Sequence, residues 1–526
     1  MRTGSARVAR GGGRRDEPTL TFRASLNALA ALVDYGARAV VQLVLAPLLL
    51  RYLGDAGYGI WQVLQKLIGH TTPAGGRPGE ALKWTVAQGQ RTSASTDEAE
   101  ITRRRQQVGT AIAVWAMFLP LVVVLGLVLA WISPDLVHAH PDQVWMVRAA
   151  AVVLVLNVVV LGIAAVPQSV LQGENLGYRR LGLSTAMLLI GGATAALALW
   201  AGYGLVGVAI ATVLTTALSG LTYLYIVRGQ VSWWGVRRPA RGTVRAFVGL
   251  SWWFLLWNLV MQLVKGSDVI VLSAIAGASL VTVYTLTSFV PQSVTDLVFM
   301  VISATMPGLG GLVGAGELDR AARVRNETMV VSWLVSVGAG ATIIVWQPAF
   351  LAIWVGEKYD AGTLATVLIC VMVTQLALIR VDSNVIDLTL RVRAKVLLGL
   401  FSALLGAGLG MLLAGPFDLG ISGLVTGLLL GRLPLTVAYP VLVGRLLKRH
   451  RVVDARAVAR PLAASVLLCA VAVLLRPFAA AEGWFALVSL GSLSAAALLL
   501  LAYITGLDTV QRRSVRRRAM RVVHLR

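Results

Sequence analysis

Two short stretches far apart in the chain decide the fold: LGDAGYGIW at 53–61 and AGASLVTVY at 276–284. In each, a glycine (Gly54, Gly277) stands seven residues before an aromatic residue (Trp61, Tyr284), at the turn between two apolar segments. A repeated order of such turns is the signature of an internally duplicated membrane protein. The pattern predicts two copies of one helical unit.

A second pair of motifs follows in the same order at a nearly equal offset. GYGLVGVAIAT holds Gly204 and Gly207, and DLGISGLVTG holds Gly420 and Gly423, each at the entry to an apolar segment. Glycine pairs are common in membrane helices, where they allow close packing, so the shared order carries more weight than any single match. With six spans per copy, both copies enter the membrane from the same side and form parallel repeats.

Composition excludes a soluble enzyme. The chain has 526 residues, 57% of them apolar and 13% charged, where soluble proteins carry roughly 25% charged residues. Its only two cysteines, Cys370 and Cys469, lie in apolar runs, which argues against a disulfide framework or a cysteine-based metal site. We expect no metal and no cofactor.

Apolar windows predict an all-α polytopic membrane protein with about fourteen transmembrane helices. Two pseudo-symmetric six-helix lobes would surround a central cavity, with two extra helices at the C-terminal end. The expected domains are a cytoplasmic basic tail (1–24), an N-lobe (25–228), a cytoplasmic linker (229–245), a C-lobe (246–446), an extra helix pair (447–505) and a basic cytoplasmic tail (506–526).

Placing the charges between these spans gives the orientation. The net charge of +23 would suggest nucleic acid in a soluble chain. Here the basic clusters alternate with loops almost free of Lys and Arg, such as 133–146, so the excess marks the cytoplasmic side and argues against a nucleic-acid partner. Both termini are therefore expected on the cytoplasmic side of the membrane, and the family resemblance given below implies that this is the inner membrane of a bacterium. The alternating basic set comprises Arg103–Arg105, Arg179, Arg180, Arg237, Arg238, Arg241, Arg320, Arg323, Arg325, Arg391, Arg393, Lys395, Lys448, Arg449 and Arg451.

A few basic residues fall at membrane depth, where each costs roughly 2.5 to 3.5 kcal/mol and should face protein or water. Arg38, Lys66, Lys265 and Arg380 are predicted to form a cationic substrate-binding cavity, while Lys83 and Arg432 could instead reach an interface. Equivalent spans carry polar stripes, which adds cavity-lining candidates. These candidates, some with a possible coupling role, are Asp34, Gln42, Asn258, Gln262, Asp268, Tyr284 and Gln292.

Simpler interpretations stay open for several of these residues. Asp34 with Arg38, and Lys265 with Asp268, could merely neutralise each other along one helix. The neutral polar side chains could equally make ordinary hydrogen bonds between helices. The break TTPAGGRPGEALKW at 71–84 either lines the cavity or forms a loop at the membrane surface.

Several stretches resemble Wzx-type polysaccharide flippases of the multidrug, oligosaccharidyl-lipid and polysaccharide exporter superfamily. They are LAPLLLRYLGDAGYGIW, GEALKW, SVLQGENLGYRR, GYGLVGVAIAT and the long run 249–286, and the resemblance covers about 25–446. It implies two six-helix lobes that carry an undecaprenyl-pyrophosphate-linked oligosaccharide across the membrane by alternating access, with a cationic lumen falling on Arg38, Lys66 and Lys265. The number of spans, fourteen, is similar to that of lipid II flippases, in which the extra pair of helices shapes a groove for the lipid tail.

The expected function is thus a flippase for polysaccharide biosynthesis, not an enzyme. No catalytic residue is assigned, and the chain has no GxxxxGK[ST] loop for ATP. The partners are membrane lipid, the polyprenyl-pyrophosphate-linked glycan and, in a larger assembly, a polysaccharide polymerase and glycosyltransferases. The alternatives are a lipid II-type flippase, a multidrug or cation antiporter of the same superfamily, a membrane enzyme, or a scaffold for glycan assembly.

Overall fold

A computed structural model describes most of the chain: residues 20–75, 78–89, 98–174, 176, 182–239, 241–388, 392–447, 455–509, 511–513 and 515. Outside these residues lie 1–19, almost all of 514–526, and several members of the basic set. Those members are Arg179, Arg180, Arg391, Lys448, Arg449 and Arg451.

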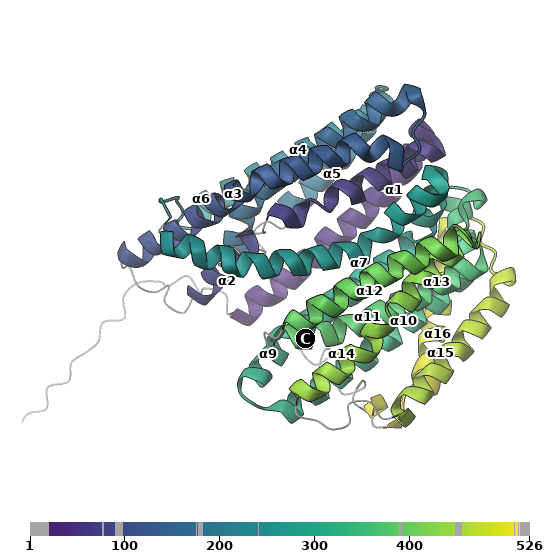
Figure 1. Cartoon of the computed structure of the whole chain (residues 1–526). Helices are drawn as coiled ribbons and strands as arrows, with labels where there is room; N and C mark the ends of the chain where they lie inside the picture. The colour runs from purple at the N-terminus through teal and green to yellow at the C-terminus, as the bar shows by residue number, and fades with distance from the viewer. Residues whose placement is uncertain are drawn as a thin grey trace, which may run out of the picture.

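The described residues are almost entirely helical and include no strand (Figure 1). The helices are α1 (Leu20–Gly69), α2 (Pro78–Gly89), α3 (Glu98–Leu136), α4 (Val144–Gly173), α5 (Leu183–Trp200), α6 (Gly204–Gln230), α7 (Arg241–Thr287), α8 (Phe289–Ala304), α9 (Met306–Gly314), α10 (Leu318–Trp354), α11 (Thr363–Leu388), α12 (Val392–Ala414), α13 (Gly420–Gly431), α14 (Leu433–Leu446), α15 (Ala455–Leu475) and α16 (Trp484–Gly506). Short 3₁₀ turns η1 (Thr72–Gly75), η3 (Pro141–Gln143), η5 (Glu357–Tyr359) and η6 (Arg476–Phe478) lie between them.

Twelve helices of the described part are long and apolar enough to cross a membrane, or thirteen if one bent pair counts as a span. The sequence prediction of about fourteen treats the segments on either side of Gly54 in α1, and of Gly277 in α7, as separate spans, which agrees with the breaks that the backbone shows there. Each of these helices is interrupted at a glycine, Gly54 (φ 72°, ψ 179°) and Gly277 (φ 74°, ψ 177°). This region of backbone space is essentially reserved for glycine, because a β-carbon would clash there.

The backbone confirms the repeat seen in the sequence. Gly54 and Gly277 share nearly identical dihedral angles. The second pair agrees as well: Gly204 (φ 56°) begins α6 and Gly420 (φ 50°) begins α13. Four glycines in left-handed geometry thus occur in the same order in the two halves of the chain.

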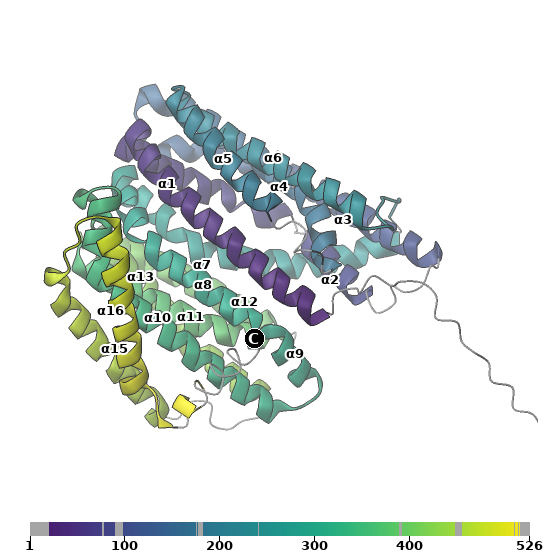
Figure 2. The ribbon, with the colours of Figure 1, turned by 180° about the vertical axis from the view of Figure 1, so that it is seen from behind.

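The helices pack in two groups and an added pair. Helices α1–α6 form the first helix group, α7–α14 the second, and both views show them side by side (Figures 1 and 2). The added pair, α15 and α16, packs on α10 at the side of the second group away from the first. We call the end of the bundle that holds Gly54 and Gly277 the hairpin end, and the opposite end, where α6 ends and α7 begins, the linker end.

The two groups meet closely at the hairpin end. A β-carbon placed on Gly59 of α1 would lie 1.9 Å from the carbonyl oxygen of Ala278 in α7, so the two backbones are in contact. Thr282 Oγ1 donates to the Asp55 carbonyl oxygen at 2.6 Å, and Trp354 Nε1 donates to the Leu43 carbonyl oxygen at 2.7 Å. Only small residues permit this approach between helices.

Side chains of η5 add charged contacts at the same end. Asp55 of the first group accepts hydrogen bonds from Lys358 Nζ at 3.0 and 3.2 Å and from the Tyr359 hydroxyl. Asp360, the next residue, pairs with Arg476 beside the added pair at 2.5 Å. We call Asp55, Lys358 and Tyr359 the hairpin-end cluster. One short turn therefore joins all three helix assemblies.

Within the second group, glycines bring α12 and α13 together. A β-carbon on Gly427 would lie 2.3 Å from the Gly410 nitrogen, and one on Gly431 would lie 2.2 Å from the Gly406 α-carbon. The glycines recur every four residues along both helices, the spacing of small residues at close helix contacts in membranes.

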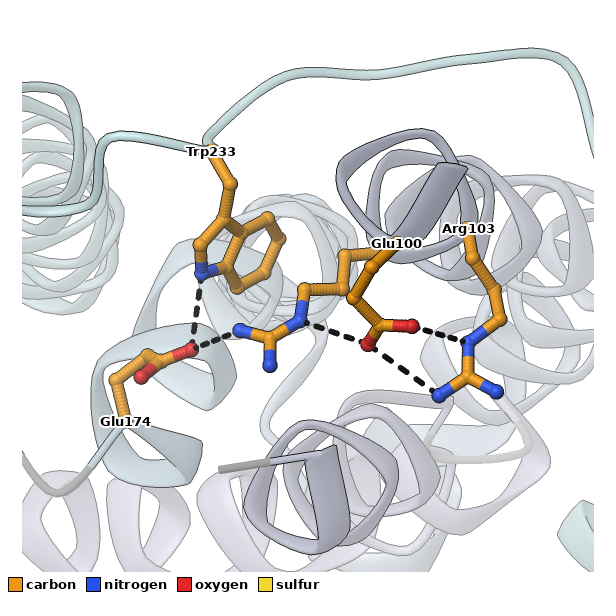
Figure 3. Close-up of polar contacts among 5 residues, drawn as sticks. Glu100, Arg103, Glu174 and Trp233 are labelled. Atoms are coloured by element: carbon orange, nitrogen blue, oxygen red, sulfur yellow. Dashed lines mark hydrogen bonds and ion pairs between the residues drawn. The ribbon is translucent and has the colours of Figure 1, made fainter. Parts of the chain in front are cut away.

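The segment between the groups is held on the first group at the linker end. Trp233 Nε1 donates to Glu174 at 2.9 Å, and Arg104 contacts both Glu174 (3.1 Å) and Glu100 (3.2 Å) (Figure 3). Backbone contacts continue the attachment: Arg105 Nε donates to the Trp233 carbonyl oxygen at 3.0 Å, and the Arg237 amide donates to the Arg105 carbonyl oxygen at 3.1 Å. Part of the expected linker 229–245 is therefore attached to the first helix group, at Trp233 and Arg237.

The prediction that Arg325 only marks the cytoplasmic side is incomplete. Arg325 of α10 forms two hydrogen bonds with Asp382 of α11, at 2.7 and 2.8 Å. The two side chains are only 8% and 2% exposed. Lys395, from the same basic set, is also fully buried and contacts Asp387 at 2.5 Å. Sequence position between two spans did not reveal that these cations join neighbouring helices.

We predict that Gly427→Leu lowers the free energy of unfolding by about 1–3 kcal/mol or more, because the side chain must push α12 away. Thermal unfolding in detergent measures the change. Gly408→Leu is the matched control, since a β-carbon there meets no atom within 4 Å. Equal effects of the two substitutions would contradict the close contact.

We predict that Asp382→Asn destabilises the protein by about 3–5 kcal/mol, because it leaves Arg325 as an uncompensated buried charge. Replacing both partners, Arg325→Met with Asp382→Leu, should restore most of the stability. Arg320→Gln is the control, since its ion pair with Glu317 is 64% and 42% exposed and should contribute below about 1 kcal/mol. Additive effects of the two buried substitutions would argue against the pair.

Candidate functional site: a polar cavity between the helix groups

A cavity of about 990 Å³ lies between the two helix groups. Both halves of α1 contribute to its wall, including Arg38 before Gly54 and Lys66 after it. The chain must reverse at Gly54 for both to face one space. Helices α5 and α6 complete the wall on one side, and α7, α8 and α11 on the other.

The described part of the cavity wall carries balanced charges. Arg38 and Lys66 are its basic residues and Asp268 and Asp296 its acidic ones, with His70 at the end of α1. The excess of cations expected from the sequence is therefore not seen among the described lining residues. Asp268 Oδ2 accepts a hydrogen bond from the Tyr284 hydroxyl at 2.6 Å, and Oδ1 accepts one from the Val269 amide at 2.8 Å.

Two predicted residues lie away from this wall. The Asp34 carboxylate accepts hydrogen bonds from Ser184 (2.7 Å) and Thr185 (3.3 Å) at the start of α5. Helical spacing placed Asp34 on one face with Arg38, but hydroxyl donors on a neighbouring helix draw its side chain aside. Arg380 lies over the Phe299 ring at 5.3 Å and is not part of the cavity wall.

Other predicted residues fall on the cavity wall or outside the described side chains. Gln42, Gln262, Tyr284 and Gln292 line the cavity, and Gln262 Nε2 also donates to the Gly69 carbonyl oxygen at 3.1 Å. The side chains of Lys265 and Asn258 lie outside the described part, so their cavity role stays a prediction.

The remaining two membrane-depth cations differ from each other. Arg432, at the junction of α13 and α14, is 5% exposed and buried within the second group, near Asp268 and Tyr284. The suggestion that it reaches an interface is wrong. Lys83 of α2 is half-buried.

Sequence reasoning missed a set of neutral hydrogen-bonding residues on the wall. Many sit at helical spacing on one face of their helix, a signal that was available in the sequence. They were overlooked because hydroxyl and amide side chains inside membrane helices commonly bond their own backbone, as Thr212 and Thr215 also do here. The missed residues include Gln62, Gln65, Thr212, Thr215, Thr216, Tyr35 and Tyr58.

The break after α1 takes a defined shape. α1 ends at Gly69, the 3₁₀ turn η1 covers Thr72–Gly75, and α2 starts at Pro78. Gly69 and His70 line the cavity, while η1 packs against α3 and α7. The break thus lies at the linker end of the cavity. The described residues hold no cluster of three or more His, Cys, Asp or Glu suited to a metal ion.

A second hollow of about 900 Å³ lies between α10, α11 and α15. Its wall is almost wholly apolar, with Trp333, Ile344, Leu378, Leu433 and Leu468 among its members. We call it the apolar groove. Cys370 and Cys469 both lie on this wall. This agrees with their positions in apolar runs of the sequence.

Part of the chain matches a known protein family. Residues 84–312 match a family described as "Polysaccharide biosynthesis protein". No curated protein matches the chain significantly in sequence.

Solved structures show the same fold at low sequence identity. A lipid II flippase MurJ in an inward closed conformation superposes with a TM-score of 0.67 at 12% identity, over 90% of this chain and 97% of that one. A multidrug resistance MATE family transporter of the MOP superfamily, inward-facing, gives 0.63 at 14% identity, over 80% of this chain and 100% of that one. An outward-facing MATE family transporter gives 0.55 at 14% identity, over 82% and 98%. The chain is therefore a multi-pass helical membrane protein with the fold of MOP-superfamily transporters and flippases, similar over 84–312 to a polysaccharide biosynthesis family.

Proposed function

We propose that this protein is a flippase that moves an undecaprenyl-pyrophosphate-linked oligosaccharide across the bacterial cytoplasmic membrane during polysaccharide biosynthesis. The observation that carries the proposal is the cavity between the helix groups, which combines basic side chains with many hydroxyl and amide groups. Pyrophosphate needs cationic donors, and an oligosaccharide needs neutral hydrogen-bond partners. The family match over 84–312 supports polysaccharide as the cargo.

Arg38 and Lys66 are the described residues placed to hold the pyrophosphate, with Lys265 as a further predicted contact. Glutamine and threonine side chains on α1 and α6 face the same space and would contact sugar hydroxyls. The polyprenyl tail stays in the lipid between the helix groups. No step in this mechanism breaks a covalent bond, so the protein acts as a transporter and not as an enzyme.

Transport would proceed by alternating access. The hairpin end is closed by the Gly59–Ala278 contact and by the hairpin-end cluster. Toward the linker end, a further hydrogen bond joins the two helix groups: the Tyr35 hydroxyl of α1 donates to the Ser293 carbonyl oxygen of α8 at 2.7 Å. With both termini in the cytoplasm, the hairpin end faces outward. Opening there requires Asp55 to separate from Lys358 and Tyr359.

A cation antiporter is the second candidate, because Asp268 and Asp296 balance the two basic residues on the described wall. A lipid II-type flippase is the third, since MurJ shares the fold. All three candidates use the same cavity, so the transported molecule distinguishes them.

We predict that Arg38→Ala and Lys66→Ala each slow transport by at least about tenfold, because a hydrogen bond to a charged group contributes about 1.5–3 kcal/mol. The assay follows the leaflet exposure of a fluorescent polyprenyl-pyrophosphate saccharide in vesicles containing the purified protein. Arg320→Ala, an exposed cation outside the cavity, should leave the rate unchanged.

Unchanged transport in both cavity variants would refute the cavity assignment. Uptake of a lipophilic cation in place of the saccharide would favour the antiporter. Selective movement of a peptidoglycan precursor would favour the lipid II-type flippase.

We predict that Asp55→Asn opens the hairpin end more often without unfolding the protein. The Asp55–Lys358 pair is 43% and 66% exposed, so it contributes little to global stability. Lys358 donates hydrogen bonds to the Asp55 carboxylate, and these raise the pKa of Lys358 above its usual 10.5. Lys358 therefore stays charged at pH 10.5 and below, and deprotonates only under more alkaline conditions.

The measurement uses a single cysteine at Thr285, on the cavity wall, with Cys370 and Cys469 replaced by alanine. A membrane-impermeant maleimide added from outside should label this cysteine several-fold faster in Asp55→Asn, while the melting temperature stays nearly constant. Glu357→Gln, in the same turn as Lys358, is the control. Equal labelling in both variants would show that the cluster does not restrain opening.

A further inference from the structure

The apolar groove is separated from the polar cavity by a single helix. Cys370, Val371 and Thr374 of α11 face the groove, whereas Ile369, Met372 and Val373 of the same helix face the cavity. The two hollows share no lining residue among those described. A lipid chain in the groove therefore lies on the opposite side of α11 from Arg38.

The groove is open to the membrane. Leu462 and Val466 of α15 line it and are 62% and 63% exposed, although both lie inside a predicted span. Apolar side chains in that position contact hydrocarbon. A volume of about 900 Å³ with an almost wholly apolar wall fits acyl chains and offers nothing to a sugar.

Basic residues flank the groove where it reaches the linker end. Leu507 and Gln511 line the groove there. Arg512 Nε donates to the Leu507 carbonyl oxygen at 3.1 Å, and Arg460, beside the groove residue Pro461, donates to the Thr505 carbonyl oxygen at 2.9 Å. Arg460 and Arg513 are exposed. Asp508 lies in the same turn, where its carboxylate accepts the Gln511 amide at 2.7 Å.

We propose that this groove binds an anionic glycerophospholipid from the leaflet at the linker end, with its acyl chains against α10, α11 and α15 and its phosphate on Arg460 and Arg513. The site is distinct from the transport cavity, and the bound lipid is not the cargo. Since α15 meets the second group along this groove, the lipid fills part of the seam that attaches the added pair. This proposal does not depend on which molecule the cavity transports.

The test measures retained lipid by native mass spectrometry after purification from vesicles of equal phosphatidylglycerol and phosphatidylcholine. We expect the unmodified protein to retain phosphatidylglycerol preferentially. Val466→Trp fills the groove and should remove the retained lipid. Leu467→Trp is the matched control, because Leu467 is 46% exposed to the membrane but does not line the groove.

Arg460→Gln tests the head group without replacing a residue that lines the groove. It should lower the preference for phosphatidylglycerol over phosphatidylcholine by about fivefold, since one basic residue near an anionic surface contributes about 1 kcal/mol. This variant keeps the proposal testable even if Val466→Trp fails to fold.

Equal retention in Val466→Trp and Leu467→Trp would overturn the site, and an unchanged lipid preference in Arg460→Gln would overturn the head-group assignment. Displacement of the retained lipid by undecaprenyl phosphate, together with loss of saccharide transport in Val466→Trp, would show that the groove holds the cargo's tail instead. Loss of transport in Arg38→Ala with lipid retention intact would leave the two sites independent, as proposed.

Discussion

The close approach of α1 and α7 at the hairpin end is the constraint on which the rest of the structure depends. Gly54 and Gly277 reverse the chain with backbone angles that no other residue adopts readily, and Gly59 lets the two backbones touch. These reversals direct both halves of each helix along one space. The polar cavity lies between the two helix groups that this contact joins, and both halves of α1 and of α7 line it.

Much of the fold could be predicted from the sequence, because helix periodicity and glycine turns are local signals. The Gly54/Gly277 and Gly204/Gly420 pairs identified the duplication, and both recur in the backbone geometry. The directions of individual side chains were harder to predict from the sequence. Asp34 shares a helical face with Arg38, yet Ser184 from a distant segment fixes its orientation. Arg325 and Arg432 looked like interfacial charges because their partners lie on other helices, and no spacing rule reveals such partners.

The described cations of the helix bundle thus divide by role. Arg325 and Lys395 pair with carboxylates and join helices within the second group, whereas Arg38 and Lys66 face open space. A polar group in a low-dielectric interior needs a partner, so a cation paired with a carboxylate has a structural explanation. A cation that lines a cavity is therefore the better indicator of a functional site. The added pair extends this division, since its groove is apolar while the cavity is not.

The attachment of Trp233 (Figure 3) and of Arg237 to the first helix group also sets a length. Beyond that attachment, the covalent connection between the two groups runs from Arg237 to Arg241, where α7 begins. Four residues span at most about 14 Å when fully extended. The segment therefore acts as a short tether that caps how far α7 can draw away from the first group at the linker end. Any widening of the cavity at the linker end is therefore greatest on the side of the bundle opposite this tether, which gives the opening a direction.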